Sequence, residues 1–276
     1  YDAAKEKLSH ALAIGQSLNE MLIIGWSHHQ LGIIHDIQGH YDAARSHLEK
    51  ACRTWETLDN VRLLSNSLNS IGIVHYNQGN LLLAQEIMEQ ALTLCRELEN
   101  RHVQTALLGN LSMIATEQED YTGAQYYLNL SLQLATLTGD ATRQGEIFTN
   151  TGRNYLLMGE LDAAVENLER SVQIAKSLGN RSMLAIAIYN LAVAREKQGA
   201  LETAEKLLAQ ALQIAQQDNL QGIECEALLD LARLLRLSDV QRAKQVSTRA
   251  VTLAESIQNP TLLERALALA QNLQAI

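Results

Sequence analysis

Bulky and small residues recur along the chain with a period of 40 residues. A bulky residue opens each period, an alanine follows three residues later, and a large apolar residue follows four residues after the alanine. Offsets of three and four place side chains on one face of a helix. The alanine column is Ala4, Ala44, Ala84, Ala124, Ala164 and Ala204, and the large column is Leu8, Leu48, Met88, Leu128, Leu168 and Leu208. The pattern predicts the same amphipathic helix in every period.

A second helix is predicted ahead of the first in each period, from a pair of residues whose second member is always small. These pairs are Leu31-Gly32, Ile71-Gly72, Leu111-Ser112, Thr151-Gly152, Leu191-Ala192 and Leu231-Ala232. A small residue at a crossing lets two helix axes approach to about 8–10 Å. Seven residues after the small residue, Gly39, Gly79, Gly159 and Gly199 suit a left-handed helix end, and Glu119 is the exception. Each period therefore predicts a helix A, a tight turn, a helix B and a looser turn.

The repeated pair predicts an all-α fold, a right-handed solenoid of helix-turn-helix repeats that forms a single domain over residues 1–276. Residues 1–18 are expected to be helix B of a truncated repeat, residues 19–258 six repeats, and residues 259–276 a terminal helix. The chain is expected to be a fragment of a longer protein. The terminal helix is apolar on more than one side, through Leu262, Leu263, Leu267, Leu269, Leu273 and Ile276. We therefore expect residues 261–276 to pack against a further helix or to mediate self-association.

The composition agrees with a helical protein that binds neither nucleic acid nor membrane. The chain contains one proline, one phenylalanine and 47% hydrophobic residues, which favours helices. A formal charge of −9 repels a phosphate backbone. No stretch approaches the roughly 20 apolar residues that a membrane span needs, and no cleavable leader is recognisable. The expected location is the cytoplasm.

The sequence contains no recognisable catalytic or metal-binding motif. Cys52, Cys95 and Cys225 lack the spacing of a zinc site or a disulfide framework and are expected to be buried thiols. All eight histidines lie in the first 102 residues, without cysteines or carboxylates at ligand spacing. No phosphate loop, His-Glu-x-x-His motif or glycine-flanked serine is present. We expect no metal, no cofactor and no enzymatic activity.

The columns resemble those of the tetratricopeptide repeat family, whose helix A carries a Leu-Gly pair and whose helix B carries alanine, a large apolar residue and alanine. The early tryptophan of the family is missing, its aromatic residue after Leu-Gly remains only as Tyr155, and the unit has 40 residues rather than 34. Units of this length are similar to Leu-Gly-Asn repeat proteins, kinesin light chains and the sensor arrays of bacterial signal-transduction ATPases. The resemblance implies that ligands bind the concave face lined by helix A, and that His35 and His75 are packing residues.

One polar column lies on this face, immediately before each Leu-Gly type pair. Its members are Gln30, Ser70, Asn110, Asn150, Asn190 and Asp230. Because carboxamides both donate and accept hydrogen bonds, a row of them can hold the backbone of an extended peptide. Alternatively, the same groups bond to one another or to adjacent helices and stabilise the stack. The resemblance favours the first interpretation, and the two are compatible.

The positions one helical turn from the column add side chains of different character at the two ends. The candidates are Trp26, His29, Ile33, Asn69, Ile73 and Tyr76 in the first two units, and Arg153, Tyr189 and Arg233 in the later units. We predict that a ligand places an apolar side chain near Trp26 and that charges near Arg153 and Arg233 set its register. The alternative for Trp26 is that it fills the seam between two units.

The sequence thus predicts a protein- or peptide-binding module, part of a larger signalling protein. The second hypothesis is a sensor array that detects an effector and regulates an attached ATPase, transcription regulator or effector domain. An enzyme is the least favoured class, because an open groove does not hold reacting groups in a water-excluded site.

Overall fold

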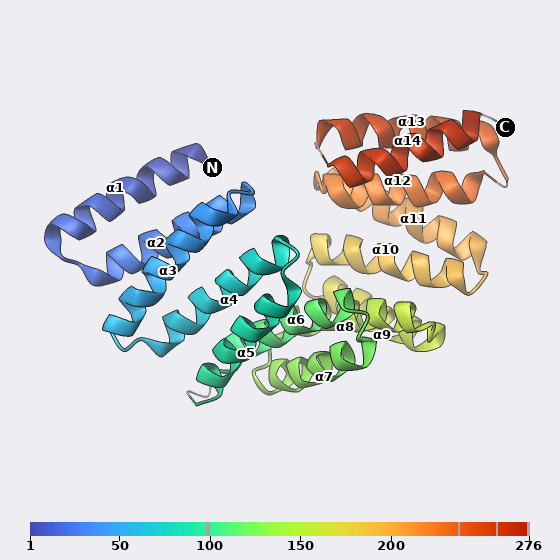
Figure 1. Cartoon of the computed structure of the whole chain (residues 1–276). Coiled ribbons are helices and arrows are strands. Elements are labelled where there is room, and N and C mark those ends of the chain that lie inside the picture. Colours follow the sequence, from blue (N-terminus) through green and yellow to red (C-terminus); the bar gives the residue numbers. More distant parts are fainter. Residues whose placement is uncertain (98–99, 237, 258, 275–276) are drawn as a thin grey trace. The chain divides into compact units, whose positions relative to one another are not determined.

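The computed structural model describes residues 1–97, 100–236, 238–257 and 259–274 (Figure 1). In these ranges every regular element is an α-helix, as the sequence predicts. The helices are α1 (Asp2–Leu18), α2 (Met21–Ile37), α3 (Tyr41–Thr57), α4 (Val61–Asn77), α5 (Leu81–Glu97), α6 (Arg101–Glu117), α7 (Tyr121–Leu137), α8 (Ala141–Met158), α9 (Leu161–Ser177), α10 (Arg181–Lys197), α11 (Leu201–Gln217), α12 (Gln221–Leu235), α13 (Val240–Ser256) and α14 (Pro260–Gln274). Even-numbered helices are the predicted helices A, and odd-numbered helices are the predicted helices B.

Tertiary contacts group the chain into two compact units, Tyr1–Gly139 with α1 to α7 and Asp140–Ile276 with α8 to α14. Within each unit, consecutive helices pack against each other. Each helix A also contacts the next helix A of its unit, as α4 contacts α6 and α10 contacts α12. The helix A faces of neighbouring repeats therefore lie side by side, and their side chains can interact across repeats.

The small and large columns form the contact between helix A and helix B. Met88 and Leu168 are almost completely buried against Gly72 and Gly152. A Cβ atom on Gly72 would lie 2.7 Å from Met88 Cγ, and one on Gly152 would lie 2.5 Å from Leu168 Cγ. Both distances are shorter than real carbon contacts, so glycine is what permits this close crossing.

The turns follow the predicted chemistry, with one informative exception. Gly39, Gly79, Gly159 and Gly199 adopt left-handed backbone angles after helix A. Glu119 occupies the same place with φ at 61°, although this conformation costs a residue with a side chain about 1–2 kcal/mol. Repeat geometry therefore prevails over local preference at Glu119.

The terminal helix α14 packs against α12 and α13 in the second unit. Leu262, Ala266 and Leu273 are buried, whereas Leu267 is 42% exposed. Leu263 and Leu269 are half-buried, and Ile276 lies outside the described residues. Much of the apolar surface of α14 is thus covered inside the unit, and self-association through this helix stays a prediction.

The three cysteines are free thiols in the interior. Burial, together with the nearby Glu56 and Glu49 carboxylates, raises the pKa of Cys52 to about 12. At neutral pH Cys52 is therefore protonated and behaves as a small hydrophobic residue. Among the helices described, none is both apolar enough and long enough to cross a lipid bilayer.

Candidate binding surface on the helix A faces

In the first unit, the polar column links one helix A to the next. Asn110 on α6 donates a hydrogen bond from Nδ2 to Oδ1 of Asn69 on α4, at 2.8 Å. Ser70 donates to the Asn66 carbonyl of its own helix at 3.2 Å. Gln30 on α2 is half-buried. The Asn69–Asn110 bond joins residues 41 positions apart, so it connects adjacent repeats directly.

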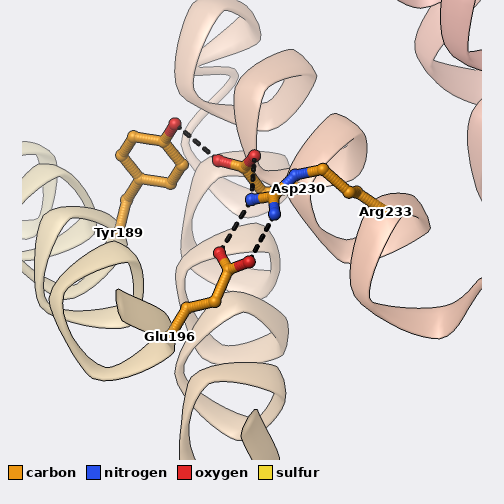
Figure 2. A network of polar contacts seen from close by, with 4 residues as sticks. All are labelled: Tyr189, Glu196, Asp230 and Arg233. Carbon is orange, nitrogen blue, oxygen red and sulfur yellow. Dashed lines mark hydrogen bonds and ion pairs between the residues drawn. The ribbon is translucent and has the colours of Figure 1, made fainter. Parts of the chain in front are cut away.

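In the second unit, the column is held by bonds inside the protein. Asn190 is buried and donates to the Ile186 carbonyl at 2.8 Å. Asp230 accepts a 2.8 Å hydrogen bond from the Tyr189 hydroxyl, again across 41 residues (Figure 2). Asn150 is half-buried on α8. The contacts of Asn110 and Asp230 fit the stack-stabilising interpretation, whereas Asn190 bonds within its own helix. A ligand-binding role of the column stays a prediction.

The aromatic end of the first unit combines exposed and buried rings. Trp26 is 44% exposed, and its ring meets the Trp55 ring edge-on at 6.1 Å and the His29 ring at 5.8 Å. Trp55 is buried, and its Nε1 donates to the Ser67 hydroxyl at 3.0 Å. His29 Nδ1 lies 2.9 Å from the same hydroxyl. Burial lowers the pKa of His29, so this predicted ligand residue is a neutral, internally bonded side chain, whereas Trp26 retains surface for a partner.

A pocket of about 150 Å³ lies between α4 and α6, with α5 beneath it. Its lining consists of Ile73, Tyr76, Asn77, Met88, Asn110 and Met113. Met88 is only 1% exposed, whereas Met113 is 45% exposed. The structure thus brings together the predicted residues Ile73, Tyr76 and Asn110, while the predicted Ile33 is half-buried on α2.

Sequence reasoning missed Met113, Asn77 and Met88 as pocket residues. Met113 follows Asn110 by three positions, as Ile73 follows Ser70, so extending the column by one repeat would have included it. Met88 was assigned only to the core column. Its second role follows from the packing of α4 and α6 side by side over α5, which the sequence columns do not specify.

Two carboxylates lie beside the pocket. Asn77 donates from Nδ2 to both carboxylate oxygens of Asp36 on α2, at 3.0 and 3.1 Å. The Tyr76 hydroxyl donates to Glu117 on α6 at 3.4 Å. Neither Asp36 nor Glu117 forms a salt bridge within the described part of the chain. The pocket therefore combines an apolar interior with a negatively charged edge.

The equivalent position in the second unit, 120 residues later, carries an ionic network instead (Figure 2). The Arg233 guanidinium on α12 binds the Glu196 carboxylate on α10 with both terminal nitrogens, with Nη2 2.7 Å from Oε2. It also donates to Asp230 at 3.0 Å. Hydrogen bonding to Glu196 raises the pKa of Arg233, and burial followed by the Asp230 charge raises the pKa of Tyr189.

These contacts bear on the predicted roles of Arg153 and Arg233 in ligand binding. The Arg233 guanidinium is engaged by two carboxylates of its own unit, so a ligand carboxylate would have to compete with both. Arg153 is exposed on α8. A role of either arginine in setting the register of a ligand stays a prediction.

Three histidines of the first unit, His28, His35 and His47, form a cluster between α2 and α3. His28 Nδ1 lies 2.9 Å from His47 Nδ1, and the His35 ring stacks on His47 at 5.4 Å. Burial, followed by the neighbouring His28, His35 and Lys50, lowers the pKa of His47 to about 4. Over the residues that the structure covers, no group of three or more histidine, cysteine or acidic side chains has the arrangement of a metal site.

Models of the tetratricopeptide repeat match residues 26–58, 63–136 and 103–177, which together make up more than half of the chain. The matched segments include α5, α6 and α4 from Leu63 onward, the helices that line the pocket. These models indicate no catalytic family. A comparison with curated proteins gives no match.

Several solved structures share the fold. BtubC from P. vanneervenii is 19% identical with a TM-score of 0.71, over 79% of this chain and 92% of that protein. A signal-transduction ATPase with a tetratricopeptide repeat sensor from Pyrococcus horikoshii is 14% identical with a TM-score of 0.75, over 92% of this chain but only 39% of that protein. A Rap protein complexed with competence and sporulation factor is 14% identical with a TM-score of 0.66, over 99% of this chain and 85% of that protein.

At these identities the likeness concerns the fold alone. The repeated helix pairs, the glycine crossings and the matching models agree with one another. On this combined ground, the chain belongs to the tetratricopeptide repeat family.

Proposed function

We propose that this chain is a protein- or peptide-binding module that takes its ligand along the helix A faces. The observation that carries the proposal is the pocket between α4 and α6, where Ile73, Tyr76 and Asn110 converge. Its lining offers aliphatic, thioether, aromatic and amide groups, which hold a ligand by packing and hydrogen bonds. The Rap protein of similar fold is complexed with competence and sporulation factor, which supports a ligand-binding use of this architecture.

A second candidate function is an effector-sensing array that regulates an attached domain. The similar Pyrococcus horikoshii protein is an ATPase whose tetratricopeptide repeats form a sensor, and this chain spans 39% of its length. A sensor must bind its effector with different affinity in two states of the full protein, whereas a scaffold does not need this difference. Both functions use the same surface, so the binding surface is the first thing to test.

The test is a selection of peptides from a random display library on the purified chain, followed by affinity measurements on a variant of the polar column. The variant replaces Gln30, Asn110 and Asn150 by alanine, because these amides are only half-buried. A control variant replaces the exposed helix B residues Gln90, Gln133 and Gln210 by alanine. The proposal predicts at least tenfold weaker binding to the first variant and less than a twofold change in the control. Equal affinities for both variants would overturn it.

A further inference from the structure

We propose that the pocket between α4 and α6 selects one apolar side chain of leucine or methionine size, flanked in the peptide by lysine or arginine. The proposal rests on the proposed function and specifies its ligand. It commits to a basic, extended peptide with a single apolar anchor.

The size of the pocket determines the anchor. An apolar cavity of this volume, about 150 Å³, accommodates a benzene-sized group. A leucine or methionine side chain fits this limit, whereas an indole requires more room. Met88 and Met113 lie at the bottom and the edge, and their flexible thioether chains adapt to anchors of slightly different shape.

The charges around the pocket determine the flanking residues. Asp36 on α2 lies beside Asn77 and Glu117 on α6 lies beside Tyr76, so both carboxylates meet the end of α4 that lines the pocket. A lysine or arginine next to the anchor can reach one of these carboxylates. The net charge of −9 also attracts basic peptides over a longer range.

The amides of the pocket have capacity for the peptide backbone. Asn110 uses one N–H toward Asn69, and a carboxamide has a second N–H and a carbonyl oxygen with two lone pairs. Asn77 uses its Nδ2 toward Asp36, and its carbonyl oxygen can accept a backbone N–H. An extended chain could thus be held by amides from α4 and α6 while its side chain enters the pocket.

The position 120 residues later supports this interpretation by contrast. There Val193, Glu196 and Arg233 replace Ile73, Tyr76 and Met113. At these positions the Arg233 guanidinium binds the Glu196 carboxylate between α12 and α10 (Figure 2). An apolar side chain would have to break these charge-assisted bonds without replacing them.

The experiment follows the ¹³C-labelled ε-methyl groups of the methionines by NMR. The chain has five methionines, so the spectrum is simple to assign. The probe is the blocked heptapeptide Gly-Ser-Lys-Leu-Lys-Ser-Gly, compared with one peptide that has alanine in place of leucine and another with glutamate in place of both lysines. We expect the Met88 and Met113 signals to move on titration, while the buried Met183 of α10 stays unchanged.

The leucine peptide should bind most tightly of the three peptides. The alanine peptide should bind roughly ten- to fifty-fold more weakly, because it buries about three fewer carbon atoms. The glutamate peptide should bind severalfold more weakly, with a difference that shrinks at high salt. Equal binding of the leucine and alanine peptides, or no movement of the Met88 and Met113 signals, would overturn the proposal.

A pair of variants tests the same point from the protein side. Tyr76→Glu with Met113→Arg introduces the residue types of Glu196 and Arg233 into the first unit. We expect at least tenfold weaker binding of the leucine peptide. The control, Tyr126→Glu with Leu137→Arg, makes the same charge change at exposed residues of α7 and should leave binding within twofold. Similar losses in both variants would contradict the proposal.

The two proposals fail in different ways. If peptides selected from the library lose affinity for the polar-column variant but never move Met88 or Met113, the pocket assignment is overturned and the binding function stands. If the polar-column variant binds the selected peptides as tightly as the unaltered chain, the assignment of the ligand to the helix A faces is overturned.

Discussion

The contact between α4 and α6 and the contact between α10 and α12 use residues 120 positions apart, yet one contains an apolar pocket and the other an ionic network. The corresponding pairs are Asn69 and Tyr189, Ile73 and Val193, Tyr76 and Glu196, Met88 and Leu208, Asn110 and Asp230, and Met113 and Arg233. Both contacts have a buried floor and a polar bond across 41 residues. The difference lies in a few side chains at the surface.

This comparison indicates how a repeat protein can vary its binding surface without altering its fold. The core columns set the crossing of helix A and helix B, and both crossings place a small residue against a large buried one, Gly72 with Met88 and Ala192 with Leu208. The surface positions of helix A are not needed for that crossing. They can therefore be apolar, as at Met113, or charged, as at Arg233.

The largest expected effect concerns Met88 and Leu208, the buried residues beneath the two contacts. Met88→Ala and Leu208→Ala should each lower the free energy of unfolding by about 2–4 kcal/mol, because both residues are fully buried. Guanidinium denaturation of each variant, fitted separately for the two units where transitions separate, measures this. A cost below about 1 kcal/mol for only one of them would show that the two floors are not equivalent.

The next effect distinguishes the network from ordinary surface charge pairs. A double-mutant cycle of Glu196→Ala and Arg233→Ala should give a coupling of about 1–2 kcal/mol, because only 15% of the Glu196 side chain is exposed. The same cycle on Glu166 and Arg170, whose side chains are 64% and 54% exposed, should give less than about 0.5 kcal/mol. Equal couplings would mean that the network is no stronger than a solvated pair.

Acid should lower the stability of the first unit more than that of the second, because all eight histidines lie in the first unit. The pKa of His47 falls from 6.5 to about 4 on folding, so the unfolded chain binds the proton more readily. Above pH 6.5, His47 therefore costs the first unit no stability. As the pH falls from 6.5 toward 4, the free energy of unfolding decreases because the unfolded chain takes up a proton at His47. We expect a loss of roughly 1–2 kcal/mol, after allowing for solvent screening at these partly exposed rings.

The fluorescence of Trp26 and Trp55 reports on the first unit alone. Denaturation followed by this signal should shift to lower denaturant between pH 7 and pH 4.5, and His47→Gln should reduce the shift. An unchanged shift in that variant would remove His47 as its source.

The smallest effect concerns the two bonds across 41 residues. Tyr189→Phe removes the donor to Asp230, and Asn69→Ala removes the acceptor of Asn110. Each should cost about 0.5–1.5 kcal/mol, as single hydrogen bonds do. Thermal denaturation of both variants measures the costs, and a cost for Tyr189→Phe alone would limit the structural role of the polar column to the second unit.

The fold could be predicted from the sequence because the same small and large columns recur in every repeat, as Gly72 with Met88 and Gly152 with Leu168 illustrate. Glu119 stands where four other repeats have glycine, and the structure keeps the left-handed conformation there. Because the small and large columns recur from repeat to repeat, the assignment of each helix does not depend on any single residue.

The site was predictable only in part. The polar column identified Asn110, but the sequence did not indicate that it would bond to Asn69 or stand beside Met113. Neighbouring helices A interact at offsets of 41 and 37 residues, as in Asn69–Asn110 and Glu196–Arg233. These offsets depend on how the helices are staggered, which the spacing of core columns does not determine.

The most direct test of the central claim is the set of intermolecular nuclear Overhauser effects from the leucine methyl groups of the bound heptapeptide. We expect contacts to the ε-methyl groups of Met88 and Met113 and none to the methyl groups of Val193. Contacts to Val193 of the same strength, or contacts to neither methionine, would contradict it.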